Sequence, residues 1–239
     1  MSLDAGLAAS LESIVSAPRL QRYRDASSSD IEMVILYCWN IKLAEALLPS
    51  LAIFEVALRN AVHTALTTKN RSEFWFKSVL HPAKYANIID LMAKITKRQG
   101  TPPTAGKVIS EITFGFWPLL FAKSYNALWW SLPNPLIADV IPNYAPIARD
   151  TRAKFEQRLE YFVALRNRVM HQEAIFQGVA ALNRPILAID VLHDQIIEAI
   201  GWINTDAQKM ALCLDRFGDV YSASGRADLE AAVRAEFKL

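Results

Sequence analysis

The sequence predicts an all-α protein, and three observations support this prediction. Hydrophobic residues make up 52% of the 239 residues, which is enough for a packed core and too much for a disordered chain. Glycine occurs only 8 times, and strand-like alternation of apolar and polar residues is hard to find. Apolar residues recur instead at helical spacing. No repeat, low-complexity tract or linker interrupts the chain, so one helical domain over residues 1–239 is the simplest organisation.

Local signals predict the helices in order along the chain. Ser29-x-x-Glu32 is typical of a capping box, which starts a helix through Leu47. Pro49 fits the first turn of a second helix. Periodicity and Gly, Pro or Thr breakers predict the remaining elements, which are a helix over 84–97, a loop over 100–106, an aromatic-rich helical segment over 107–130 interrupted at Pro118, and helices over 149–176, 184–204, 206–216 and 226–237.

The net charge, the cysteines and the apolar runs indicate the compartment of the protein and the partners that it can have. The formal net charge is +2, so a polyanion site has to come from local clustering of basic residues. Cys38 and Cys213 lie far apart in apolar sequence, which predicts two buried reduced thiols in a reducing compartment. No Lys or Arg precedes Arg19, and the apolar stretch 112–122 is too short to cross a membrane. We expect a cytoplasmic protein with no membrane partner.

Signatures of cofactors and metals are missing from the sequence. The glycines of loop 100–106 are one residue too far apart for a phosphate-binding P-loop, and Val108 rather than Ser or Thr follows Lys107. The four histidines are scattered, and none forms a short ligand pair with another His, Cys or carboxylate. We therefore expect no metal and no cofactor.

The segment 159–173 carries the most informative residues. On a helical wheel, Leu159, Phe162, Val163 and Met170 form the predicted buried stripe, and Arg166 falls in its middle. Asn167 and His171 lie one turn apart at its border, and Arg168 is expected to point to solvent. A guanidinium on an apolar face needs a charged partner or a polar cleft. Arg166 is thus either a structural arginine paired with a carboxylate or a phosphate ligand beside a histidine.

A second group of polar residues is spaced as a ladder. Glu55, Arg59 and His63 follow one another at intervals of four and border the apolar stripe of their own helix. One interpretation is an ordinary ion pair with a surface histidine. The other is a wall of the same cleft, which would help to orient Arg166 or His171.

Four sequence blocks, in order, resemble a known family. They are Pro18-Arg-Leu-x-x-Tyr23, Phe54-Glu-Val-Ala-Leu-Arg-Asn60, Gly106-Lys-Val-x-x-Glu-x-x-Phe-Gly-Phe-Trp117, and Leu165-Arg-Asn-Arg-Val-Met-His171 followed by Glu173. The last resembles the Arg-x4-His signature of HEPN domains as it occurs in Abi-like (abortive infection) proteins. The resemblance covers about residues 18–205 and leaves 206–239 as a C-terminal helical extension.

The resemblance implies a helical bundle of HEPN type, often dimeric, in which paired Arg-x4-His helices line one cleft. It also implies metal-independent endoribonuclease activity, often in phage defence, with an antitoxin or other regulatory protein as a further partner. Family members often carry a second His after the signature, where this chain has Gln172. Some HEPN proteins bind RNA or partners without catalysis, so activity does not follow from the fold.

The leading hypothesis is RNA cleavage by attack of the 2′-hydroxyl on the adjacent phosphate. His171 would act as general acid or base, Arg166 would stabilise charge in the transition state, and Asn167 would orient His171 or the phosphate. One His per chain leaves the acid–base pair incomplete, and a homodimer would supply the second copy. The alternatives are a non-catalytic HEPN module that binds RNA or a partner protein, and a purely structural interaction protein.

Overall fold

The computed structural model describes residues 3–129, 135–148 and 151–238, and within these ranges the chain is mostly helical. The all-α prediction is confirmed. The helices and strands are α1 (Leu3–Val15), α2 (Ala17–Asp25), α3 (Asp30–Asn70), α4 (Phe76–Val79), α5 (Pro82–Gln99), α6 (Ala105–Glu111), α7 (Phe116–Leu119), a 3-10 turn η1 (Lys123–Tyr125), α8 (Asn126–Trp129), α9 (Ile137–Val140), α10 (Thr151–Met170), β1 (Val179–Ala180), β2 (Ile186–Leu187), α11 (Ile189–Ile203), α12 (Thr205–Leu214), α13 (Phe217–Tyr221) and α14 (Ala223–Phe237).

These elements belong to two compact units. The first unit comprises residues 1–52, 161–197 and 210–239, and the second comprises 53–160 and 198–209. The chain passes between them four times, and each passage falls inside a helix, in α3, α10, α11 and α12. The expectation of a single domain over 1–239 stays a prediction.

The core of the first unit is aliphatic, with aromatic side chains at its edges. Tyr23 packs against Tyr37 and Phe176, each with ring centroids 5.3 Å away. Trp39 stacks on Tyr221, and its indole N–H donates to the Val220 backbone oxygen at 3.0 Å. The side chains of this core that are 0% exposed are Leu20, Leu43, Leu47, Phe162, Leu165, Ile175, Val179, Leu192 and Ile196.

Aromatic side chains dominate the core of the second unit. Phe121 stacks on Trp129 with centroids 4.4 Å apart and meets the edge of Phe155 at 5.1 Å. Arg152 is 7% exposed, and its guanidinium donates to the Phe121 backbone oxygen, to Asn126 Oδ1 at 3.0 Å and to Glu156 at 2.6 Å. A buried arginine with such a full set of acceptors is a structural residue.

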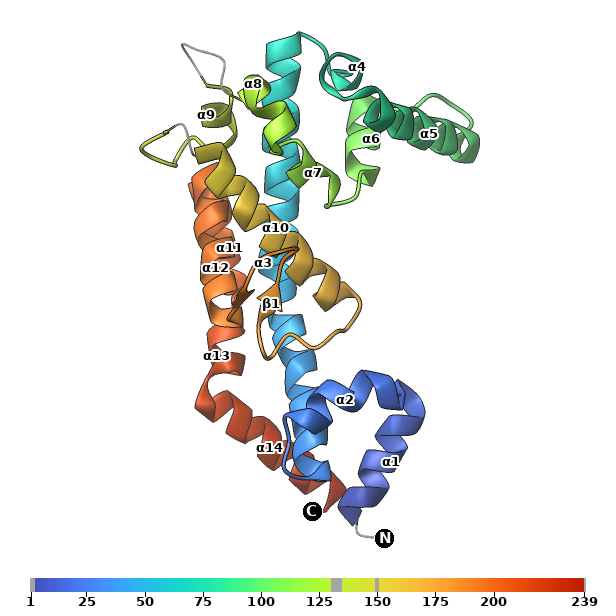
Figure 1. The fold of residues 1–239 in the computed structure, drawn as a ribbon, viewed down its shortest axis with the longest axis vertical. Helices are drawn as coiled ribbons and strands as arrows, with labels where there is room; N and C mark the ends of the chain where they lie inside the picture. The colour runs from blue at the N-terminus through green and yellow to red at the C-terminus, as the bar shows by residue number, and fades with distance from the viewer. Residues whose placement is uncertain (1–2, 130–134, 149–150, 239) are drawn as a thin grey trace. The chain divides into compact units, whose positions relative to one another are not determined.

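Helix α3 is one continuous element in Figure 1, whereas the sequence predicts two helices that meet at Pro49. A proline inside a helix removes one backbone hydrogen bond and costs about 3 kcal/mol. Burial on either side of Pro49 offsets this cost, because Leu47 is 0% and Leu51 is 3% exposed.

The capping box at the start of α3 takes a modified form. The Ser29 hydroxyl accepts from the Glu32 amide at 3.2 Å, as predicted. The Glu32 carboxylate instead accepts from the amide and hydroxyl of Ser28, both at 2.7 Å. These bonds hold the pKa of Glu32 below its usual range.

Most helices predicted from 84 onward are found, with shifted ends. The segment predicted over 107–130 is instead divided into α6, α7, η1 and α8, and Pro118 lies inside α7 rather than at a break. Residues 186–187, predicted to be helical, form β2. Helix α5 begins at Pro82, after the N-cap His81, and ends at Gly100, whose φ of 79° lies in the left-handed region. The helix predicted over 149–176 ends at Met170, and its predicted start at Arg149 lies outside the described residues. Helices α1, α2, α4, α9 and α13 and the hairpin β1–β2 were not predicted.

The two cysteines are less buried than predicted. Cys38 is half-buried, and burial raises the pKa of its thiol. Cys213 is exposed, because it lies on the outer side of α12 while Ala211 faces the core.

Candidate functional site

The Arg-x4-His segment ends in a tight backbone turn that terminates α10. The His171 amide still donates to the Asn167 oxygen at 2.9 Å, so His171 is the last residue in the helical bonding pattern. Gln172 then adopts a φ of 55°. The Gln172 amide donates to the Val169 oxygen at 3.2 Å, and the Glu173 amide donates to the Arg168 oxygen at 2.8 Å. This pair of bonds is a Schellman motif, with glutamine where glycine is usual.

Asn40 of α3 anchors this turn from inside the first unit. It is 2% exposed, and its Oδ1 accepts from the amides of Ile175 at 2.7 Å and Phe176 at 3.2 Å. Its Nδ2 donates to the Glu173 backbone oxygen at 3.1 Å. One side chain therefore satisfies three backbone groups just after the helix, which fixes where His171 leaves α10.

Arg168 also holds the turn, which corrects the expectation that it points to solvent. It is half-buried, and its Nη1 donates to the Ala174 oxygen at 3.2 Å. Its Nε lies 4.0 Å from a carboxylate oxygen of Glu173. Glu173 itself thus serves the turn through its backbone, while its carboxylate is 55% exposed.

The predicted buried stripe of this helix is only partly right, because Leu159 and Phe162 are 0% exposed as predicted while Val163 is half-buried. Met170, expected inside, is 53% exposed, whereas Leu165 and Val169 are 0% and 5% exposed. With about 100° of rotation per residue, the buried face is turned by roughly a quarter of a circle from the predicted one. Arg166 therefore lies half-buried at the edge of the core rather than in its middle.

An exposed strip results at the C-terminal end of α10. Asn167, Met170 and His171 are exposed, and the half-buried Arg166 borders them. Around the helix axis Met170 and Asn167 fall between Arg166 and His171, which are about 140° apart. The strip thus presents a guanidinium at one edge, an imidazole at the other, and an amide and a thioether between them.

The ladder of Glu55, Arg59 and His63 lies in α3, in the second unit. The Trp75 indole N–H donates to His63 Nδ1 at 3.0 Å, so this ring is a neutral acceptor rather than a surface histidine. Burial of His63 lowers its pKa below the usual value. Glu55 and Arg59 are half-buried, and Arg59 Nε has no hydrogen-bond partner among the described residues. Their part in a cleft with Arg166 or His171 stays a prediction.

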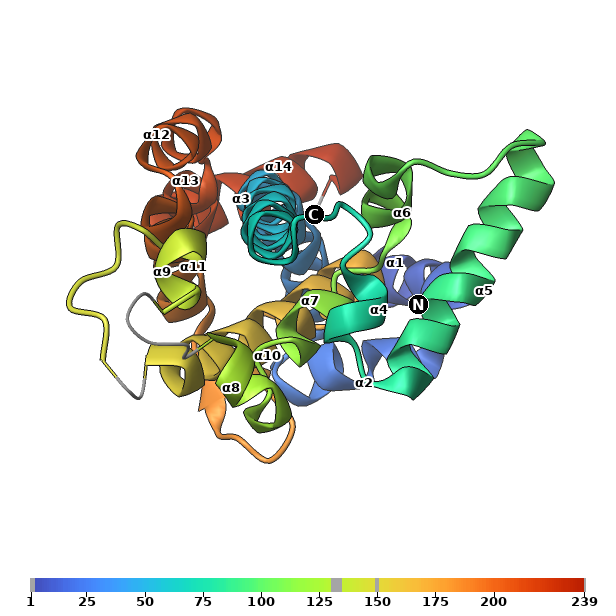
Figure 2. The same ribbon diagram turned by 90° about the horizontal axis from the view of Figure 1, so that it is seen from above.

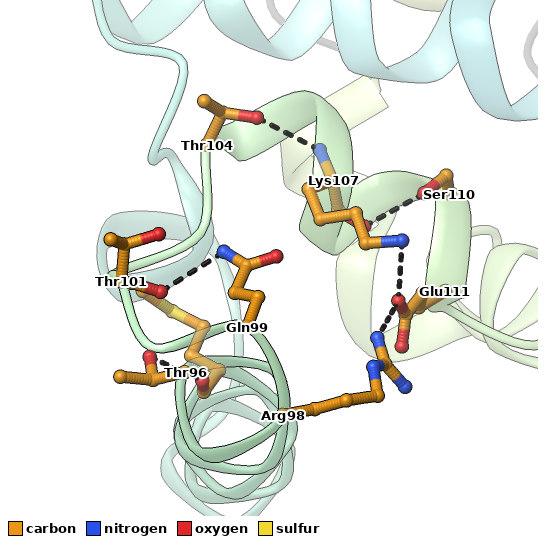
Figure 3. Close-up of polar contacts among 9 residues, drawn as sticks. Thr96, Arg98, Gln99, Thr101, Thr104, Lys107, Ser110 and Glu111 are labelled. Atoms are coloured by element: carbon orange, nitrogen blue, oxygen red, sulfur yellow. Dashed lines mark hydrogen bonds and ion pairs between the residues drawn. The ribbon is translucent and has the colours of Figure 1, made fainter.

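The loop that superficially suggests a phosphate site is tied down by an acidic residue. Figure 3 shows Lys107 and Arg98 reaching the same carboxylate, that of Glu111, with Lys107 Nζ at 2.8 Å. The Thr104 hydroxyl caps α6 by accepting from the Lys107 amide at 3.2 Å, and Figure 2 shows the loop joining α5 to α6. Lys107 is thus paired with Glu111. The hydrogen bonds that Glu111 accepts, first from Lys107 and then from Arg98, lower the pKa of its carboxyl group.

Sequence reasoning missed two contributors to the turn. Asn40 carries no motif, and its partners are more than 130 residues away. Arg19 of α2 donates from Nη1 to the His171 backbone oxygen at 3.4 Å. A signal for Arg19 existed in the Pro18-Arg-Leu-x-x-Tyr23 block, which lies in α2 and contacts the same region.

Comparisons with known proteins add no family to these observations. No protein-family model, curated protein or solved structure matches the chain. In the described ranges no helix is long and apolar enough to cross a membrane, and no group of three or more His, Cys, Asp or Glu side chains is placed to hold a metal ion. The resemblance to Abi-like HEPN proteins stays a prediction that rests on the four sequence blocks.

Proposed function

We propose that this protein is a metal-independent endoribonuclease of HEPN type whose catalytic groups are Arg166 and His171. The observation that supports the proposal most is the exposed strip at the end of α10, where both side chains border an accessible surface. The Schellman turn and Asn40 fix the backbone beside it. Catalytic groups need this kind of support, because small displacements reduce rates steeply.

The chemistry would follow from the side-chain types. Histidine titrates near neutral pH and can take the proton of the 2′-hydroxyl or give one to the leaving 5′-oxygen. The guanidinium of Arg166 presents a planar fork of donors to the phosphate oxygens on which charge develops. Asn167 lies between the two on the strip and would orient the phosphate or the imidazole.

A homodimer would complete the acid–base pair. Each chain supplies one signature histidine, and cleavage by 2′-hydroxyl attack uses both a base and an acid. Met170 is 53% exposed in the middle of the strip, so it would lie in the contact between two copies. Two α10 helices meeting there would bring two copies of His171 to one RNA strand.

The second candidate is a non-catalytic HEPN module that binds RNA or a partner protein. Gln172 favours it, because family members often carry a second histidine at this position. If that histidine has a role in proton transfer, this chain lacks it. Either form would suit phage defence through abortive infection, with an antitoxin or other regulatory protein as a further partner.

The deciding experiment measures cleavage of single-stranded RNA and identifies the product ends. We expect a 2′,3′-cyclic phosphate and a 5′-hydroxyl, no cleavage where the scissile nucleotide lacks its 2′-hydroxyl, and full activity in EDTA. His171→Ala is expected to lose about 10²–10⁴-fold in rate, and Arg166→Ala about as much. Arg166→Lys is expected to restore little, because an ammonium cannot reproduce the fork.

The matched control is Arg234→Ala. Arg234 lies in α14 of the first unit, 42% exposed, with its Nε 2.9 Å from Glu230, so the variant removes the same charge away from the strip. Arg168→Ala is unsuitable, because Arg168 holds the turn. A folded His171→Ala protein that cleaves RNA as fast as wild type, and as fast as Arg234→Ala, refutes the catalytic proposal in favour of the binding module.

A further inference from the structure

A polar pocket lies beside the turn that ends α10, within the first unit. Its volume is about 330 Å³, and its polar lining consists of Arg19, Arg22 and Tyr23 from α2, Tyr37 from α3, and Gln172 and Glu173 from the turn. Gln172 and Glu173 were singled out in the sequence, whereas Arg19, Arg22 and Tyr23 appeared only as part of the Pro18-Arg-Leu-x-x-Tyr23 block.

The Tyr23 hydroxyl is the unusual feature of this pocket. Tyr23 is 2% exposed, yet its hydroxyl has no hydrogen-bond partner among the described residues. Buried hydroxyls nearly always have partners, so such a group calls for an explanation. The groups that act electrostatically on it are Tyr37, Arg19 and Arg22, all of which line the pocket. Tyr23 itself lines the pocket, and we infer that its unpaired hydroxyl turns toward a bound ligand and donates a hydrogen bond to it.

The chemistry of the lining favours an anion. Arg19 and Arg22 are exposed and bring two positive charges to the pocket. The acidic member, Glu173, has its carboxylate 4.0 Å from Arg168 Nε, which offsets part of its charge. Guanidinium forks together with phenol hydroxyls are donors suited to the oxygens of a phosphate group.

The pocket also adjoins the proposed catalytic residue. Arg19 lines the pocket and at the same time donates from Nη1 to the His171 backbone oxygen at 3.4 Å. Gln172, which also lines it, is the next residue after His171. An anion held here would lie directly beside the end of the strip.

We propose that this pocket is a second phosphate subsite, which holds a backbone phosphate of a single-stranded RNA next to the phosphodiester at Arg166 and His171. The inference rests on the proposed function for the identity of the strand. Arg22 and Arg19 neutralise the phosphate, and Tyr23 donates a hydrogen bond to one of its oxygens. The subsite thereby sets the register of the RNA on the strip.

The test is the affinity of the full-length protein for a fluorescein-labelled single-stranded RNA, measured by anisotropy at several salt concentrations. All variants carry His171→Ala, so that the RNA stays intact. Arg22→Ala is expected to weaken binding about tenfold. It should also reduce the slope of log affinity against log salt by about 0.7, the value for one phosphate contact on a single strand. Arg234→Ala, which removes a charge away from the pocket, is expected to bind like the parent.

Tyr23→Phe separates binding from folding. It removes the hydroxyl and keeps the ring packing, so the RNA affinity should fall about tenfold with an unchanged salt slope. The melting temperature of the RNA-free protein should be equal or higher, because an unpaired buried hydroxyl is removed. A hydroxyl with a merely structural role would leave the RNA affinity unchanged.

The outcomes distinguish this proposal from the catalytic one. Arg22-dependent and Tyr23-dependent RNA binding in a protein that cleaves nothing supports the subsite and refutes catalysis. Cleavage that requires His171, with an RNA affinity insensitive to both Arg22→Ala and Tyr23→Phe, overturns the subsite and leaves catalysis standing. A protein that binds no single-stranded RNA overturns both.

Discussion

Asn40→Ala tests the idea that one buried amide holds the end of α10 in place. The substitution removes two acceptor bonds, to the amides of Ile175 and Phe176, and one donor bond, to the oxygen of Glu173. Ile175 is 0% exposed, so its amide would have no access to water after the change. A buried donor left unsatisfied costs about 1–3 kcal/mol, and each of the other two bonds contributes about 0.5–1.5 kcal/mol.

The expected loss of unfolding free energy is therefore about 4 kcal/mol, the middle of the summed ranges. Urea denaturation followed by circular dichroism measures it, and with an m-value of about 2–3 kcal/mol per molar the midpoint should fall by about 1 M or more. RNA cleavage by the folded fraction should also slow, because the backbone at His171 loses its anchor.

Asn60→Ala is the matched control, because Asn60 lies on the same helix and is exposed. A surface change of this kind is expected to shift stability by about 0.5 kcal/mol or less. An Asn40→Ala protein that loses less than about 1 kcal/mol, or no more than Asn60→Ala, contradicts the role assigned to Asn40.

Three further predictions concern the turn, a histidine and the assembly. Gln172→Gly should leave the unfolding free energy unchanged or raise it by up to about 1 kcal/mol in thermal melts. Glycine adopts the left-handed backbone without strain, and the strain relieved exceeds the extra conformational entropy that glycine loses on folding. A clear loss of stability contradicts this prediction. Burial lowers the pKa of His63 in the folded protein, so only the unfolded state takes up a proton as the pH drops below about 6.5. The unfolding free energy should therefore fall between pH 7 and pH 5. The denaturation midpoints at these two pH values should differ less in His63→Gln than in the wild type. Light scattering should show a homodimer that Met170→Glu weakens, and a monomer at micromolar concentration with and without RNA counts strongly against the proposed pairing.

Local signals were enough to predict most helices. Breakers act over a few positions, so the loop predicted over 100–106 correctly separated the helix predicted over 84–97, which is α5, from the helical segment that follows it. Pro49 misled the same reasoning, because the burial that keeps α3 continuous comes from tertiary packing. The hairpin was not predicted because its strands are two residues long, which is too short for an alternating pattern to be recognised.

The candidate site was only partly predictable. The resemblance drew attention to Arg166 and His171, and they do border one exposed strip. The wheel placed Arg166 wrongly, because Met170 was assumed to be buried on its hydrophobicity alone, while Leu165 and Val169 take the core positions. Asn40 could not be found, since its contacts join segments more than 130 residues apart. Arg19 lies in the Pro18-Arg-Leu-x-x-Tyr23 block, but its contact with His171 spans 152 residues and was not predicted.

The route of the chain between its two compact units has a practical consequence. Every passage occurs within a helix, in α3, α10, α11 and α12. Any expression fragment chosen to isolate one unit must therefore cut helices in mid-course and leave carbonyl and amide groups without partners. A fragment that starts at residue 53, for instance, would keep only the second half of α3 and would lose Asn40 and Trp39, which contact the turn after α10 and Tyr221. Deletion mapping on this protein will report broken helices rather than the activity of a unit, so point substitutions are the appropriate tool for dissecting it.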